Sequence, residues 1–139
     1  MDDAPGDLAA VDAALARGDV AAAMRAWHAA YGATIGSRRW EGFLDAGDAY
    51  LRIARASGSP AGGISRARDL FLSALFRASG AGSLEGVLRI ASAFAELGDD
   101  EVVTHSLRIA RRLAGANLDT ALRERLDTLQ PGSPAAPTR

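Results

Sequence analysis

The sequence predicts an all-α fold built from stacked helical hairpins. Apolar residues recur at helical spacing almost throughout the 139 residues, and strand-like alternation is scarce. Alanine, the best helix former, occurs 31 times. One spacing of small, large and small residues occurs three times, and it places all three on one helical face. Its members are Ala23, Trp27 and Ala30, then Ala67, Phe71 and Ala74, then Val103, Leu107 and Ala110.

The first hairpin is predicted over residues 7–33, with helices near 7–17 and 20–33. Gly18 suits a left-handed helix end, and Asp19 can cap the helix that follows. Ser37 is the expected cap of a third helix near 38–57.

The second hairpin is predicted over residues 38–79, and its turn is rich in glycine. Residues 57–63 read Ser-Gly-Ser-Pro-Ala-Gly-Gly, which predicts a flexible loop before a fourth helix near 64–79. The repeated spacing starts 44 residues apart in its first two copies and 36 residues apart in its last two. We assign the eight extra residues to this loop.

The third hairpin is predicted over residues 84–114, with Ser83 as its cap and helices near 84–97 and 100–114. Gly98 and Asp99 repeat the signal seen at Gly18 and Asp19. Asn117 is the expected cap of a last helix, 118–129, whose leucines would cover the third hairpin. We therefore expect one domain over residues 1–130 and a disordered tail over 131–139.

The middle hairpin reads Phe43-x2-Ala46-Gly47-x2-Tyr50, followed by Ala67-x3-Phe71-x2-Ala74. This pattern resembles the tetratricopeptide repeat, in which a small residue lets the two helices of a hairpin approach each other. The resemblance extends over about residues 7–115, although the closing proline of the repeat is absent from all three copies. It implies a short right-handed α-solenoid of three helical hairpins plus a C-terminal capping helix.

The resemblance also implies a groove, lined by the first helix of each hairpin, that binds a segment of a partner protein. The implied lining residues are Leu8, Asp12 and Leu15, then Glu41, Leu44, Asp48 and Leu51, then Glu85, Leu88, Ser92 and Ala95. Such a groove suits an amphipathic or basic segment. A second interpretation stays open, in which Leu44, Leu51 and Leu88 belong to the core.

Arg38, Arg39 and Trp40 form the best local cluster for a specific contact, because Arg and Trp are enriched at binding hot spots. In the alternative interpretation, the arginine stems and Trp40 cover the edge of the core.

The sequence contains no catalytic or cofactor motif. It has no cysteine and only two histidines, His28 and His105, neither of which has ligands at metal-binding spacing. The net charge of −1 and the lack of a broad basic stripe disfavour nucleic acid and anionic membranes as partners. No apolar stretch reaches the length needed to span a bilayer, so we expect a cytoplasmic protein without cofactor or metal.

These observations favour a non-catalytic adaptor or scaffold that binds a protein or peptide partner. One alternative is a self-associating structural or assembly protein, including a homodimer, since short solenoids expose apolar surfaces. A third alternative is an enzyme or small-molecule sensor with a pocket near Arg39, Trp40 and Tyr50.

Overall fold

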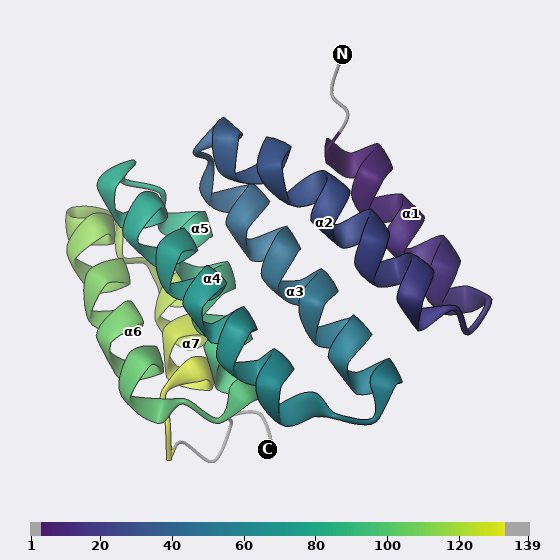
Figure 1. The fold of residues 1–139 in the computed structure, drawn as a ribbon. Coiled ribbons are helices and arrows are strands. Elements are labelled where there is room, and N and C mark those ends of the chain that lie inside the picture. Colours follow the sequence, from purple (N-terminus) through teal and green to yellow (C-terminus); the bar gives the residue numbers. More distant parts are fainter. Residues whose placement is uncertain (1–3, 133–139) are drawn as a thin grey trace. The chain divides into compact units, whose positions relative to one another are not determined.

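The computed structural model describes residues 4–132, with side chains from residue 8 onward, and this part of the chain is all-α (Figure 1). It holds seven α-helices, one 3-10 turn and no strand. The elements are α1 (Ala4–Ala16), α2 (Val20–Ser37), α3 (Trp40–Ser57), α4 (Pro60–Gly80), α5 (Leu84–Leu97), α6 (Asp100–Ala114), η1 (Gly115–Asn117) and α7 (Thr120–Leu129). No helix in these residues is both long enough and apolar enough to cross a membrane.

The chain divides into two compact units, residues 1–74 and residues 75–139, and the division falls inside α4. In unit 1, α1, α2 and α3 all contact one another. In unit 2, each of the helices α5, α6 and α7 likewise contacts the other two. The single domain over residues 1–130 stays a prediction. Residues 133–139 of the expected tail lie outside the described part.

The thrice-repeated spacing forms core in both units, as the sequence predicts. Each of its nine side chains is at most 1% exposed. Trp27, Phe71 and Leu107 are the large members, and the small residues on either side of them let neighbouring helices approach.

Most predicted helix ends are confirmed by backbone conformation and capping. Gly18 and Gly98 adopt left-handed φ values of 74° and 77°. The side chain of Asp19 accepts a hydrogen bond from the amide of Ala22, and Ser83 does the same for Gly86. These caps satisfy amide groups that otherwise have no partner in the first helical turn.

Two predicted caps are at the wrong residue, and a third, Asp99, is the N-cap residue of α6 without a side-chain cap hydrogen bond. Helix α2 continues to Ser37, whose hydroxyl donates to the Thr34 carbonyl at 2.7 Å instead of capping α3. Arg38 ends α2 in a left-handed conformation, with φ of 59°, which few residues other than glycine adopt. Asn117 lies in η1, and Asp119 caps α7 by accepting from the Leu122 amide at 2.8 Å.

The predicted flexible loop over residues 57–63 is also wrong. Gly58 ends α3 with φ of 81°, and α4 begins at Pro60, a residue favoured in the first turn of a helix. The extra residues of the middle hairpin are therefore helical, since α3 and α4 have 18 and 21 residues against 14 and 15 in α5 and α6.

Gly63 shows why a glycine lies inside α4. It is buried, and a Cβ atom at this position would overlap Cβ of Ala54 on α3. Gly62 has open space around it. The glycine pair thus contains one residue needed for close helix packing and one that is not.

Candidate functional site

Helix α3 presents a polar face that contains the predicted acidic site residues, Glu41 and Asp48. Glu41 and Asp48 are half-buried, and Asp45, which the sequence analysis did not include, is exposed between them. Their spacing of four and three residues puts the three carboxylates on one side of the helix. The result is an acidic face that starts near the N-terminus of α3.

Three of the five leucines of the predicted groove are core residues, whereas Leu8 and Leu15 are half-buried. Leu44, Leu51 and Leu88 are 3%, 5% and 1% exposed. Their place on the first helices of two hairpins is compatible with either interpretation, and their burial favours the core. The apolar part of the predicted groove is therefore absent from the accessible surface at these three positions.

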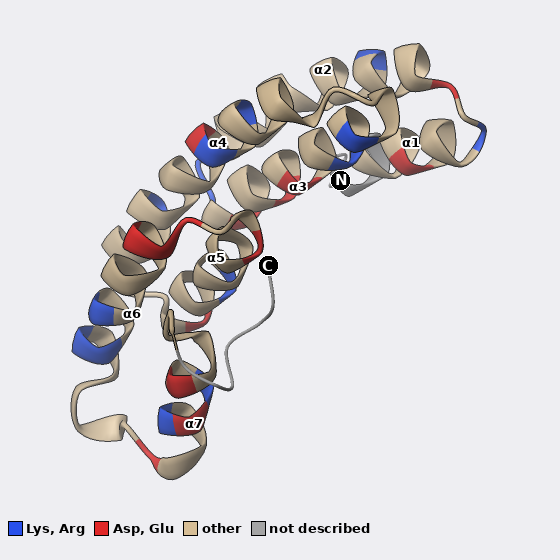
Figure 2. Cartoon of the chain, turned by 90° about the horizontal axis from the view of Figure 1, so that it is seen from below, with Lys and Arg blue, Asp and Glu red and all other residues tan. Residues whose placement is uncertain are grey.

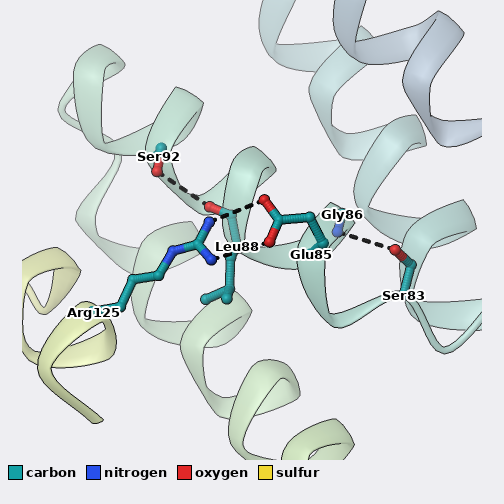
Figure 3. A network of polar contacts seen from close by, with 6 residues as sticks. All are labelled: Ser83, Glu85, Gly86, Leu88, Ser92 and Arg125. Atoms are coloured by element: carbon teal, nitrogen blue, oxygen red, sulfur yellow. Dashed lines mark hydrogen bonds and ion pairs between the residues drawn. The ribbon is translucent and has the colours of Figure 1, made fainter. Parts of the chain in front are cut away.

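The predicted residues of α5 lie on the side that contacts α7, as Figure 3 shows for Glu85, Leu88 and Ser92. Both oxygens of the Glu85 carboxylate accept hydrogen bonds from Arg125, at 3.0 and 3.1 Å. The Ser92 hydroxyl donates to the Leu88 carbonyl at 3.2 Å. Glu85 of α5 thus forms a salt bridge with Arg125 of α7 within unit 2.

The forked pair changes the titration of both groups. The hydrogen bond from Arg125, together with its charge, lowers the pKa of Glu85, while the same bond raises the pKa of Arg125. The side chains are 62% and 45% exposed, so solvent screens their attraction. The pair is a surface contact between α5 and α7, and its energy is small.

Unit 1 contains an equivalent contact between α1 and α3. Arg52 donates to one carboxylate oxygen of Asp12 through Nη2 at 2.8 Å and through Nε at 3.1 Å. Asp12 and Arg52 are 40 residues apart, which is also the separation of Glu85 and Arg125. The equal separation of the two pairs is present in the sequence. It can be recognised only when each helix is compared with the second helix after it.

The predicted Arg38, Arg39 and Trp40 cluster surrounds the turn between α2 and α3. Arg38 is exposed and ends α2, while Arg39 is the N-cap residue of α3 without a side-chain cap. The Arg39 side chain is 72% exposed and lies 3.4 Å from a carboxylate oxygen of Glu41. Trp40 is half-buried. The two arginines therefore extend into solvent beside the acidic face of α3.

Trp27 lies at the centre of an aromatic cluster that was not predicted from the sequence. Trp27 is 1% exposed, and its buried Nε1 donates a hydrogen bond to the Ala46 carbonyl of α3 at 2.9 Å. Tyr31 stacks on this ring and Tyr50 meets it edge to face, both at 4.8 Å between centroids. The Arg66 guanidinium lies over Trp27 and Tyr31, at 5.9 and 5.3 Å from their centroids. Tyr50, expected near a pocket, thus packs against the core of unit 1.

The histidines lie on the second helices of different hairpins. The His28 ring meets Trp27 edge to face at 5.2 Å, and His105 is exposed on α6. Within the described part of the chain, no three His, Cys, Asp or Glu side chains are grouped so as to hold a metal ion. Neither a family model, a curated protein nor a solved structure matches this chain.

Proposed function

We propose that the chain is a non-catalytic protein-interaction module, an adaptor or scaffold built as a short right-handed α-solenoid of three hairpins with α7 as its cap. The observation that carries the proposal is the recurrence of one contact in both units. A carboxylate and an arginine 40 residues apart join α1 to α3 and join α5 to α7. In solenoids, each repeat contacts its neighbours in the same manner, and the exposed surfaces bind partners.

The acidic face of α3 is the surface proposed for the partner. It carries Glu41, Asp45 and Asp48, with Arg52 one turn further along the helix. With Leu44 and Leu51 in the core, recognition on this face depends on charge and hydrogen bonding. The proposed partner is therefore a basic or amphipathic protein segment.

Partner capture from the native host, followed by a charge reversal on α3, tests this proposal. The double variant Glu41→Arg and Asp48→Arg is expected to weaken capture strongly, because like charges would then face the basic segment. The matched control is Glu124→Arg with Asp127→Arg, on the exposed side of α7. Equal capture by both double variants would refute the location of the surface.

Self-association is the second candidate function, and the exposure of Phe76 favours it. This α4 residue is 79% exposed, whereas the other three phenylalanines, Phe43, Phe71 and Phe94, are at most 5% exposed. Light scattering over a range of protein concentrations tests this candidate. A dimer that dissociates in Phe76→Ser would support it, and a monomer at all concentrations would exclude it.

A further inference from the structure

Helix α6 has one face in the core and an opposite face that is charged. The buried face consists of Val103, Ser106, Leu107, Ile109, Ala110 and Ala114. The exposed side begins at Glu101 and ends with Arg108, Arg111 and Arg112. Figure 2 shows this division of charge, with α6 red at its start and blue toward its end.

The three arginines have no partner among the residues that the structure describes. None of their side chains forms a hydrogen bond or an ion pair with another described residue. No Asp or Glu lies three or four residues from any of them, whereas Arg108 has Arg111 and Arg112 at these spacings. Positive charges at such spacings repel each other and weaken a helix.

Several other exposed arginines have an acid within reach, whereas Arg17, Arg25 and Arg55 have no acid three or four residues away but are dispersed along the chain. Arg89 has Glu85 four residues before it, Arg123 has Asp127 four residues after it, and Arg125 binds Glu85. The attraction between cations and a helix C-terminus accounts for Arg111 and Arg112, which lie in the last turn. Arg108 lies before that turn, so the helix end does not account for the whole cluster.

We infer that Arg108, Arg111 and Arg112 form a docking surface for an acidic segment of a partner protein. The guanidinium group binds carboxylates through two parallel hydrogen bonds, and arginine is enriched at binding hot spots. Residues 108–112 extend about 6 Å along the helix, which matches two or three neighbouring carboxylates of an extended peptide. This inference adds acidic protein segments as a second class of partner for the interaction module, and it rests on the function proposed above.

The size of the cluster favours a protein segment over other anions. Recognition of anionic lipid typically uses about four to eight basic residues, and α6 offers three. A nucleic acid backbone would extend beyond three arginines and meet the acidic start of the same helix, at Asp100 and Glu101. An acidic peptide segment is short enough to avoid these residues.

A direct binding assay on the full chain tests the inference without requiring the natural partner. The probe is a fluorescent eight-residue peptide with four glutamates, and the reference is the same peptide with glutamines. We expect only the glutamate peptide to bind, with an affinity that decreases as salt is added. The triple variant Arg108→Gln, Arg111→Gln and Arg112→Gln should weaken binding about tenfold.

The control triple variant removes the same charge from dispersed exposed positions, Arg17→Gln, Arg25→Gln and Arg55→Gln, and should retain binding. Circular dichroism checks folding, and Arg108→Gln alone replaces the triple variant if helicity falls. No binding by the wild type, or an equal loss in the control, would overturn the inference. Tighter binding of a single-stranded oligonucleotide or of phosphatidylserine vesicles through the same arginines would also overturn it. Because the assay leaves Glu41, Asp45 and Asp48 unchanged and uses no host protein, its failure is distinct from failure of the acidic face of α3.

Discussion

Gly47 of α3 lies against the ring of Phe71 of α4, so closely that a Cβ atom at residue 47 would be 2.5 Å from Cε1 of Phe71. Real Cβ atoms do not approach other atoms to this distance. Phe71 is itself fully buried. The hydrogen side chain of Gly47 therefore sets how near α3 and the first part of α4 can come in unit 1.

The contact between Gly47 and Phe71 predicts coupled effects on stability. Phe71→Ala should lower the free energy of unfolding by about 3–5 kcal/mol, as for other buried aromatic residues. Gly47→Ala should lower it by about 1–3 kcal/mol because the new methyl group meets the ring. In the double variant the methyl group fills space that the ring has left, so the loss should be smaller than the sum. Urea unfolding measures all three. Additive losses would contradict the contact, and an unchanged melting temperature in Phe71→Ala would contradict the core assignment.

The neighbouring glycines Gly62 and Gly63 should respond to alanine in opposite directions. Gly62→Ala should stabilise the protein by about 0.5–1 kcal/mol, because alanine is the better helix former and has open space there. Gly63→Ala should destabilise it by about 1–3 kcal/mol, because its methyl group would overlap Ala54. Thermal unfolding of the two variants provides an internally controlled comparison. Equal effects would contradict the close crossing of α3 and α4 at this point.

Removal of the Trp27 N–H group should destabilise unit 1. Trp27→Phe removes the side-chain donor to the Ala46 carbonyl and replaces the buried indole with a smaller ring. The free energy of unfolding should therefore fall by at least about 1 kcal/mol. Tyr31→Phe is the matched control, since it keeps the stacked ring and should have little effect. Denaturant unfolding measures both. A loss in Tyr31→Phe as large as that in Trp27→Phe would contradict a specific role for the indole hydrogen bond.

The forked contact between Glu85 and Arg125 predicts a pH-dependent contribution to stability. Arg125 lowers the pKa of Glu85 in the folded chain, so the contribution is fully present above the unfolded pKa of about 4.3. It disappears as the pH falls through the lower folded value. At pH 7, Glu85→Gln should therefore cost less than about 1 kcal/mol, because both side chains are largely exposed.

Unfolding of the wild type and Glu85→Gln between pH 3 and pH 7 measures this contribution. The two stabilities should converge at the acidic end and should also converge at high salt. Glu124→Gln, at an exposed position of α7, is the control, and it should not reproduce the salt-dependent loss expected of Glu85→Gln. A difference that grows toward acidic pH would contradict the direction of the Glu85 pKa shift.

The core and most helix ends could be predicted from the sequence because their signals are local. The spacing around Trp27, Phe71 and Leu107 depends only on helical periodicity, and Gly98 ends a helix through its own backbone freedom. The loop over residues 57–63 was predicted wrongly because glycine has two uses. Gly58 ends a helix, whereas Gly63 lies inside one, where Ala54 leaves no room for a side chain.

The candidate site was harder to predict because its contacts join residues far apart in the chain. Leu88 has the same helical position whether it faces a groove or another helix, and only its burial in the structure distinguishes the two. The contacts of Asp12 with Arg52 and of Glu85 with Arg125 depend on which helices meet. The unpaired state of Arg108 likewise depends on every neighbour of α6 in space.

The division of the chain at residue 74 has a spectroscopic consequence. Both tryptophans and both tyrosines, Trp27, Trp40, Tyr31 and Tyr50, belong to unit 1, and unit 2 has only phenylalanine as an aromatic residue. Intrinsic fluorescence excited at 280 nm therefore reports on unit 1 alone, whereas far-ultraviolet circular dichroism reports on helices in both. Coincident unfolding curves from the two signals would indicate one cooperative domain, and separate curves would resolve the stability of each unit without any label.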